Sequence, residues 1–296
     1  ERANWQFLLE QADSLQGLKT YEEAHQYYKQ ALEILIQNAK WEKAFETGLA
    51  LANNLQKQGS LKQAIASSEK LIKELAPNTP QPSVAMGNFL HKLGVFYYLD
   101  NDYNKAQQTF ERAILLRQQL AKEHELDLAR SHHNLGVVLK EKGNLTLAIK
   151  HLQEAIRLRK THSKPTLLAD SYHELGIVYE QLGDYDQALA THLTNLAILE
   201  QNNPDINYKT GRTYSETGIV YRKRKTFDKA LKYLKKSQSI FNELYGPNDV
   251  DGARAYTNIG NTLADQKKFE EALSNYQKAH KIYEAQKNDP PNLARN

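Results

Sequence analysis

The sequence predicts an all-α fold, built as a solenoid of about seven helix–turn–helix repeats. The helix formers Ala, Leu, Glu, Lys and Gln dominate the chain, whereas it holds only 14 Gly and 8 Pro. Long alternating runs of β-branched residues, which are typical of strands, do not occur. One pattern of a small residue, a turn and an alanine returns every 40 to 42 residues. A constant period of this kind is typical of stacked helical repeats.

Two columns of small residues define the repeat, one in each of its two helices. The second helices carry Ala24, Ala64, Ala106, Ala148, Ala188, Ala230 and Ala272. The first helices carry Ala12, Ala52, Gly94, Gly136, Gly176, Gly218 and Gly260. Small side chains let the paired helices approach closely, so large neighbours such as Tyr97 and Leu139 are expected to fill the core between them.

Taken in order, the repeats are expected at residues 4-38, 40-76, 82-122, 124-162, 165-202, 204-245 and 247-286. Together they form one predicted solenoid over residues 1-286. Three prolines within residues 76–83 separate the second repeat from the third, because proline ends a helix. Residues 287-296 are polar and are expected to form a tail.

Composition limits the possible functions. The net charge is only +4, and the 39 basic and 35 acidic residues are interspersed, so we expect no nucleic-acid partner. No apolar run reaches the ~18 residues of a membrane helix, so no membrane insertion is expected. The absence of cysteine excludes disulfides and thiolate sites and fits a cytoplasmic location. Because the chain begins with Glu1 and not Met, we expect it to be part of a longer product.

The repeat resembles the tetratricopeptide repeat (TPR) family, whose motif is W-x2-L-G-x2-Y followed by A-x3-F. The clearest copy here is Leu175-Gly176-x2-Tyr179 with Ala188 in the second helix. The tryptophan position of the motif departs from the family and holds Leu90, His132, Tyr172, Tyr214 and Tyr256. The period of 40 to 42 is similar to that of kinesin light chains, leucine-glycine-asparagine-repeat adaptors and bacterial peptide-responsive regulators. The resemblance implies a right-handed superhelix over about residues 4–286.

The resemblance also implies that the first helices line a concave groove that binds a protein or peptide. Carried onto this sequence, the partner-binding residues are Asn88, His91, Lys92, Tyr98, Arg130, His133, Asn134, Val137, Lys140, Asp170, His173, Glu174, Ile177, Arg212, Ser215, Glu216, Arg222, Arg254, Asn258 and Asn261. The apolar members belong to a strip that also includes Val95 and Ile219. Basic residues are in excess in the C-terminal half of the groove, so we expect an acidic or amphipathic segment there.

Three features of this groove have competing interpretations. His91, His133 and His173 form one column, but stacked helices lie about 8–10 Å apart, so we expect no metal site. The asparagines either grip a peptide backbone or form a solvated face, and both interpretations stay open. Asp170 and Glu174 lie one helical turn apart, yet an open groove is a poor setting for catalysis. His132, in the tryptophan column, is expected to be packed.

We therefore expect a non-catalytic scaffold without cofactor or metal that binds a protein or an extended or helical peptide. The alternative is a peptide-sensing or autoinhibitory module of a larger signalling or effector protein. The domains that flank this segment in its gene would distinguish the two. The sequence leaves the oligomeric state open.

Overall fold

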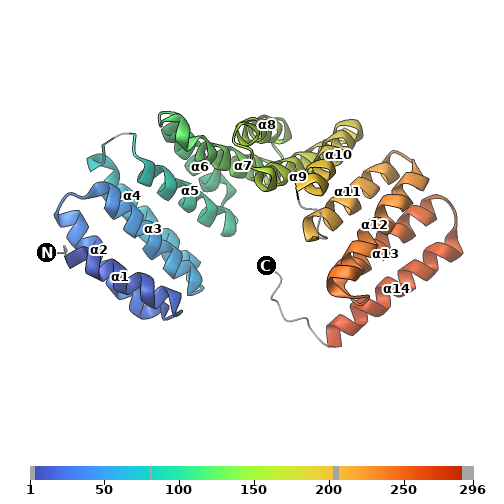
Figure 1. Cartoon of the computed structure of the whole chain (residues 1–296), viewed down its shortest axis with the longest axis horizontal. Helices are drawn as coiled ribbons and strands as arrows, with labels where there is room; N and C mark the ends of the chain where they lie inside the picture. Colours follow the sequence, from blue (N-terminus) through green and yellow to red (C-terminus); the bar gives the residue numbers. More distant parts are fainter. Residues whose placement is uncertain (1–3, 81, 203–206, 289–296) are drawn as a thin grey trace. The chain divides into compact units, whose positions relative to one another are not determined.

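The computed structural model describes residues 4–80, 82–202 and 207–288. Within these ranges the chain is built from helices and turns, without strands (Figure 1). The α-helices are α1 (Asn4–Gly17), α2 (Tyr21–Gln37), α3 (Trp41–Lys57), α4 (Leu61–Leu75), α5 (Val84–Leu99), α6 (Tyr103–Arg117), α7 (Glu125–Glu141), α8 (Leu145–Thr161), α9 (Pro165–Leu182), α10 (Tyr185–Asn202), α11 (Tyr208–Lys223), α12 (Phe227–Tyr245), α13 (Val250–Asp265) and α14 (Phe269–Asn288). Two short 3-10 helices, η1 (Ala76–Asn78) and η2 (Lys122–His124), precede α5 and α7.

The described helices pair in sequence order, odd with even, and give seven helix–turn–helix repeats. This confirms the all-α fold class and the count of repeats. Helix α14 continues to Asn288, so the predicted tail at 287-296 begins inside a helix. From residue 289 onward that prediction lies outside the described part of the chain.

The chain divides into two compact units, residues 1–162 and residues 163–296. The N-terminal unit holds α1 to α8, and the C-terminal unit holds α9 to α14. Each is described by itself, and a single solenoid over residues 1-286 stays a prediction.

The turns within the repeats share one geometry. A residue with a left-handed backbone stands at Lys19, Gly59, Asn101, Gly143, Gly183, Lys225 and Lys267. The N–H of the next residue donates to the carbonyl five positions back, as from Asn144 to Leu139 over 2.8 Å. This bond satisfies a carbonyl that the helix end leaves without a partner. The turn therefore fixes the position at which each second helix begins.

The glycine column produces the close approach that the sequence predicts. A Cβ atom added at Gly136 would lie 2.7 Å from Cγ of Leu152 in the paired helix. Ala148, which faces the same contact, is fully buried. Both small residues are therefore required by the spacing of α7 and α8.

The junction after α4 departs from those after α2, α6, α10 and α12. Here α5 packs mainly against the first helix α3, because the proline-containing connection displaces it from α4. The rings of Phe45 and Phe89 meet edge to face with centroids 5.3 Å apart. Glu42 of α3 also accepts a hydrogen bond from the Ala85 N–H at the start of α5, over 3.1 Å.

Candidate partner-binding surface

An open pocket of about 250 Å³ lies between the first helices α5 and α7 of the N-terminal unit. Its lining consists of Val95, Tyr98 and Leu99 of α5, Phe110 of α6, and Asn134 and Val137 of α7. Leu99 is 47% exposed, which is a high fraction for a large aliphatic side chain beside a pocket. Apolar walls with a few polar groups are typical of binding sites. We call this the α5–α7 pocket.

Three of the predicted groove residues, Tyr98, Asn134 and Val137, meet in the α5–α7 pocket. Sequence reasoning missed Leu99 and Phe110. A signal for Leu99 was present in the sequence, because the second repeat and the fourth to seventh repeats all carry a charged or amide side chain at this position. These residues are Lys57, Glu141, Gln181, Lys223 and Asp265. A lone leucine in a polar column at the end of a first helix marks the pocket.

Polar side chains of neighbouring first helices form hydrogen bonds between residues 43 positions apart. The three rungs are His91 Nε2 with Asn134 Nδ2 at 3.4 Å, His173 Nδ1 with Glu216 Oε2 at 2.9 Å, and Asn258 Nδ2 donating to Ser215 Oγ at 3.5 Å. We call these contacts the inter-repeat ladder. All six residues were predicted to face a partner. The structure bonds them to one another across the junctions between repeats, and Asn134 also lines the α5–α7 pocket.

Burial keeps His91, in the first rung of the ladder, in its neutral form. His91 is only 8% exposed, and its other nitrogen, Nδ1, lies 3.2 Å from Ser131 Oγ. Burial lowers the pKa of His91 well below its usual value, and the nearby cations Arg117, Arg130 and Lys92 lower it further. A neutral imidazole has one donor and one acceptor nitrogen, which suits two polar neighbours. The buried positions of His91 and His173 differ from the exposed groove positions that the sequence predicts.

Arg117 of α6 joins three helices of the N-terminal unit. Its Nη1 donates to the Asp127 carbonyl over 2.7 Å and to Ser131 Oγ over 2.5 Å. Its Nη2 donates to Asn88 Oδ1 over 2.7 Å. Burial lowers the pKa of Arg117 to about 10, so the guanidinium is still charged at neutral pH. The predicted groove residue Asn88 is therefore part of a structural clamp between α5, α6 and α7.

The C-terminal unit contains a buried polar network around His192, at a position where the third, fourth, sixth and seventh repeats carry large, mainly apolar residues. His192 of α10 is fully buried against Gly176, whose added Cβ would lie 2.3 Å from the imidazole Cε1. His192 Nε2 lies 2.8 Å from Glu180 Oε1, and its Nδ1 lies 3.9 Å from Glu216 Oε2. Glu216 also bonds His173, as described above. Burial raises the pKa of Glu216 to about 7.

Sequence reasoning missed His192, although its column carried a signal. From the third repeat onward the corresponding residues are Phe110, Leu152, Leu234 and Tyr276, all large and mainly apolar. A histidine in this column indicates a buried polar contact, because a buried imidazole requires partners. We call Glu180, His173, His192 and Glu216 the His–Glu network.

The remaining predicted residues lie apart from the pocket, and most have intramolecular partners. The ion pairs are Arg130–Asp127 at 3.3 Å, Lys140–Glu141 at 3.2 Å, Asp170–Lys209 at 2.6 Å, Arg212–Glu216 at 3.7 Å, Arg222–Asp265 at 3.2 Å and Arg254–Asp251 at 2.9 Å. Asn261 accepts a hydrogen bond from the Tyr276 hydroxyl at 2.9 Å, Lys92 lies 5.0 Å from the Phe96 ring, and Glu174 lies 3.9 Å from His173. Ile177 and His133 are half-buried. Arg130 and Arg254 have the most exposed side chains among these basic residues, 54% and 66%, and exposed ion pairs contribute little to stability, so these two cations are available for exchange with a partner.

His132 is packed, as predicted. It is 7% exposed and stacks on His151 with ring centroids 5.1 Å apart. Their Nδ1 atoms lie 2.9 Å apart, so one nitrogen donates and the other accepts. Burial, followed by the neighbouring His151, lowers the pKa of His132 to about 4.

Replacing His132 with leucine is expected to remove an acid-sensitive contribution to stability. The usual histidine pKa is 6.5, whereas that of folded His132 is about 4, so the unfolded chain binds this proton first as pH falls. The free energy of unfolding should thus drop by about 3 kcal/mol between pH 6.5 and pH 4. Leu90 occupies the same column, so leucine fits. Urea unfolding of both proteins across this range is the measurement, and parallel pH profiles would contradict the assignment.

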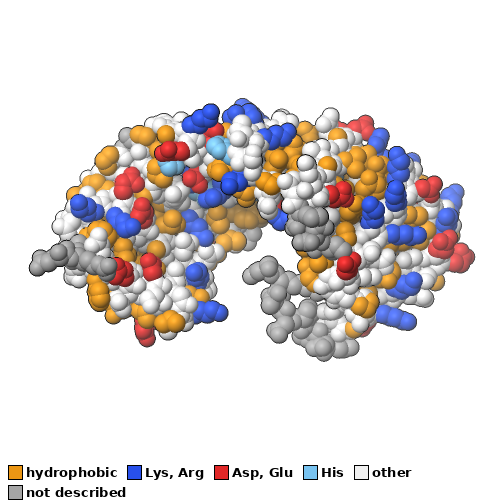
Figure 2. All heavy atoms as spheres, viewed as in Figure 1, with side chains coloured by type: hydrophobic (Ala, Val, Ile, Leu, Met, Phe, Trp, Pro, Cys, Tyr) orange, Lys and Arg blue, Asp and Glu red, His pale blue; other side chains and the backbone are white. Residues whose placement is uncertain are grey.

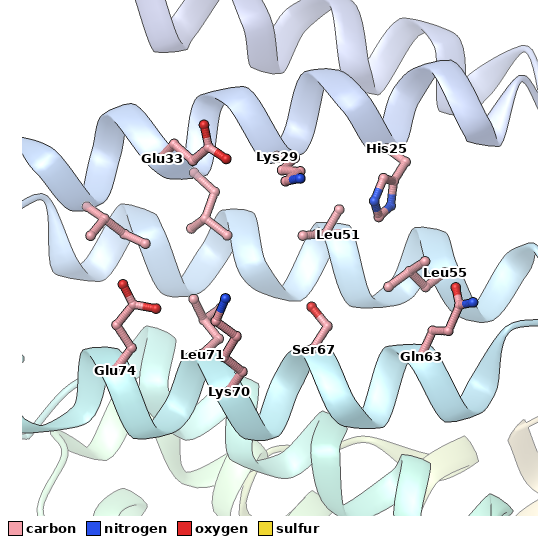
Figure 3. A pocket seen from close by; sticks show the side chains of 12 residues that line it. His25, Lys29, Glu33, Leu51, Leu55, Gln63, Ser67, Lys70, Leu71 and Glu74 are labelled. Carbon is pink, nitrogen blue, oxygen red and sulfur yellow. The ribbon is translucent and has the colours of Figure 1, made fainter.

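A larger pocket of about 430 Å³ opens between the second helices α2 and α4 of the N-terminal unit (Figure 3). Leu51 and Leu55 of α3 line it between those two helices. Its rim contains Lys29 and Glu33 on α2 and Lys70 and Glu74 on α4, among others. The two signs of charge are therefore mixed along this rim, which gives it little electrostatic preference.

Across residues 4–80, 82–202 and 207–288, no group of three or more His, Asp or Glu side chains is arranged to hold a metal ion. In the same ranges, none of the helices combines the length and the apolar character that crossing a membrane requires.

The stacked helix pairs define a helical repeat protein with the architecture of a protein-binding scaffold. Residues 86–161 and 209–285 match a family model described as tetratricopeptide repeat, and residues 171–205 match a second model of the same description. The first model alone covers more than half of the chain. The chain belongs to the tetratricopeptide repeat family, as the sequence resemblance indicates.

Two relatives share part of the sequence. Nuclear autoantigenic sperm protein of Homo sapiens is 28% identical over 96 residues, which are 32% of this chain and 12% of that protein. Histone-binding protein N1/N2 of Xenopus laevis is 27% identical over 92 residues, which are 30% of this chain and 15% of that protein. The chain thus matches only a small part of either relative.

Two solved structures share the fold. A signal transduction ATPase with a tetratricopeptide repeat sensor from Pyrococcus horikoshii has a TM-score of 0.76 at 17% identity, covering 96% of this chain and 43% of that chain. A putative kinesin light chain from Podosopora anserina has a TM-score of 0.61 at 17% identity, covering 69% of this chain and 97% of that chain. The likeness to kinesin light chains agrees with the long repeat period.

Proposed function

We propose that this protein is a non-catalytic scaffold that binds a protein or peptide segment along the first helices of its repeats. The observation that carries the proposal is the α5–α7 pocket, which has apolar walls and the Asn134 amide in its lining. Neither matching family model describes an enzyme. The absence of cysteine favours a reducing compartment such as the cytoplasm.

The pocket suits one apolar side chain of a bound segment. Its volume of about 250 Å³ is smaller than the ~300–1,000 Å³ typical of small-molecule sites. Anchoring of single side chains in pockets, with polar contacts to the peptide backbone, is a common mode of peptide recognition. Asn134 offers both a donor and an acceptor for such a backbone.

Charge around the pocket favours an acidic or amphipathic segment. In addition to burial, Arg130 and Lys92 both lower the pKa of His91. The His91 ring lies 5.4 Å from that of Phe110 in the pocket lining. Lys57 also lowers the pKa of Lys92, although burial is the larger cause. These cations would attract carboxylates of a partner. A strongly basic partner, such as a histone tail, is disfavoured at this site, although one relative carries a histone-binding name.

In the C-terminal unit we propose a contact surface made of groove residues that solvent reaches, including the exposed Arg254 and the half-buried Arg212 and Arg222. The rungs of the inter-repeat ladder in this unit would support this surface from below and would not touch the partner directly. The partner-binding role of the predicted groove residues outside these rungs is part of this proposal.

A charged substitution in the pocket is the sharpest test. Val137→Arg places a guanidinium among the apolar walls, whereas Leu147→Arg changes an exposed leucine of α8 in the same unit. Both proteins would be presented with an immobilised library of short peptides. We expect the wild type and Leu147→Arg to select the same peptides with an apolar anchor, and Val137→Arg to lose that selection by at least tenfold. Identical selection by all three proteins would remove the pocket from the proposal.

A second candidate function is a peptide-sensing or autoinhibitory module of a larger signalling or effector protein. The observation that favours it is the fold match to the Pyrococcus horikoshii ATPase, which has a tetratricopeptide repeat sensor. Sequencing the full gene decides between the two functions. A flanking nucleotide-binding or effector domain supports the module, and a gene that encodes repeats alone supports the scaffold.

A further inference from the structure

A basic patch lies outside the first-helix groove, on α12 and the turn before it. Residues 224–236 contain six Lys or Arg residues and one Asp, although the net charge of the whole chain is only +4. Figure 2 shows Lys and Arg side chains gathered over the part of the molecule where Figure 1 places α12. The rest of the chain is net negative, so this patch is a local concentration and not a reflection of overall composition.

Several of these cations have no carboxylate partner. Arg224 forms an ion pair with Asp186 at 2.8 Å. Within residues 207–288 and the other described ranges, the exposed Lys232 forms no ion pair, and neither does the exposed Lys235. Unpaired lysines on one helix repel each other, so an anionic partner would relieve that repulsion.

Tyrosines position two further lysines. Lys236 Nζ lies 4.9 Å from the Tyr214 ring centroid and donates to the Tyr214 hydroxyl over 3.1 Å. Lys229 Nζ lies 5.6 Å from the Tyr221 ring centroid. Contacts of this type hold an ammonium group over an aromatic face and restrict its movement. The patch is therefore partly preorganised.

The same lysines stand beside a slot between the second helices α10 and α12. The slot has a volume of about 260 Å³. Leu193, Leu196 and Ala197 of α10 give the slot an apolar side, and its other lining residues are Glu200, Tyr214, Lys232, Tyr233 and Lys236. The Glu200 carboxylate accepts a hydrogen bond from the Tyr214 hydroxyl, and the lysines outnumber it. An apolar side next to a basic rim suits a ligand that has an apolar group close to negative charges.

We propose that this lysine-rimmed slot binds an acidic peptide segment that inserts one apolar side chain between α10 and α12. The site is separate from the α5–α7 pocket and does not depend on the function proposed for that pocket. The carboxylates of the segment would meet Lys232, Lys235 and Lys236. The slot would bury the apolar side chain.

The aromatic residues favour a peptide over a nucleic acid. Single-stranded nucleic acids bind by stacking bases on accessible aromatic faces. Tyr214 and Tyr221 are only 7% and 8% exposed, and lysines lie over their rings, so neither ring offers such a face. A phosphate backbone would also leave the apolar side of the slot, formed by Leu193, Leu196 and Ala197, without a partner.

The corresponding position in the N-terminal unit supplies a matched control. The pocket between α2 and α4 lies between second helices in the same manner, and its rim carries Lys29 and Lys70 together with Glu33 and Glu74 (Figure 3). Its mixed rim predicts no attraction for an acidic peptide. Lys29→Glu with Lys70→Glu changes the net charge of the chain by the same amount as Lys232→Glu with Lys235→Glu.

The test is fluorescence anisotropy with a labelled peptide of glutamates that carries two leucines one helical turn apart. A second peptide has both leucines replaced by alanine, and a single-stranded oligothymidine of similar charge is the third probe. The full chain is compared with the Lys232→Glu/Lys235→Glu protein, with the Lys29→Glu/Lys70→Glu protein, and with Ala197→Phe, which places a ring in the slot. Circular dichroism establishes that each variant is folded.

We expect the leucine peptide to bind the wild type and the Lys29→Glu/Lys70→Glu control within twofold of each other. Binding should weaken at least tenfold in Lys232→Glu/Lys235→Glu and in Ala197→Phe, and at least fivefold for the alanine peptide. Equal binding by the charge-reversed and wild-type proteins would overturn the proposal. Equal affinity for the leucine and alanine peptides would show that the slot does not take part in binding. Tighter binding of oligothymidine with the same dependence on Lys232 and Lys235 would assign the patch to nucleic acid instead.

Discussion

Replacing Arg117 with alanine is expected to lower the free energy of unfolding of the N-terminal unit by about 4 kcal/mol. The substitution leaves three acceptors without their donor, namely Asn88 Oδ1, the Asp127 carbonyl and Ser131 Oγ. Each buried polar group that loses its hydrogen bond costs about 1–3 kcal/mol. A cavity adds to this loss, because Arg117 is only 3% exposed. Urea unfolding at neutral pH measures the change, and hydrogen exchange in α5 and α7 should locate it.

The matched control for this prediction is Arg157→Ala on α8. The Arg157 side chain is 61% exposed and forms an ion pair with Glu154 over 2.7 Å. An exposed pair of this kind is worth about 1 kcal/mol or less. A similar loss of unfolding free energy in the two variants would mean that Arg117 acts only as a surface charge. It would contradict the role of Arg117 as a clamp between α5, α6 and α7.

Replacing Glu216 with glutamine is expected to make the C-terminal unit more stable than the wild type above pH 7. The pKa of Glu216 is raised from 4.5 to about 7 in the folded state, mainly by burial. The folded chain therefore holds this proton more tightly than the unfolded chain, and stability falls as pH rises from about 4.5 to 7. The loss amounts to about 3 kcal/mol. Glutamine cannot ionise, so the variant should lack this loss.

The experiment follows the free energy of unfolding of both proteins from pH 4.5 to pH 8.5. His173, His192, Glu174, Glu180 and Arg212 face or influence Glu216 and are present in both proteins, so the difference between the profiles isolates Glu216. Glu270→Gln, at an exposed position of α14, is the control and should follow the wild type. Profiles of wild type and Glu216→Gln that differ by a constant amount would show that the carboxyl group does not titrate in this window.

The repeat architecture was predictable because residues within each repeat determine its helix–turn–helix structure. Small residues such as Gly136 and Ala148 set the distance between paired helices, and the turn after each first helix fixes where the second begins. These effects are local in sequence. The packing of α5 on α3 was not predictable, because a proline-containing connection permits more than one path and only tertiary contacts such as Phe45–Phe89 select among them.

The candidate site was predictable only in part, for a geometric reason. Tyr98, Asn134 and Val137 follow from the helical period within a repeat, and the pocket contains them. Whether a first-helix residue faces solvent or its neighbour depends on the offset between stacked repeats, which the period does not give. His91 was therefore expected in the groove, whereas it is buried against Ser131 and Asn134.

The inter-repeat ladder limits how this protein can change by recombination. Repeat arrays lengthen and shorten when whole repeats are copied or lost, and such events are tolerated when every junction is equivalent. Here the junctions differ chemically: one rung joins an imidazole to an amide, another an imidazole to a carboxylate, and a third a hydroxyl to an amide. A repeat moved to another place meets a neighbour suited to a different residue. We therefore expect relatives to keep the order of the repeats and to diverge by paired substitutions across a rung instead of by shuffling.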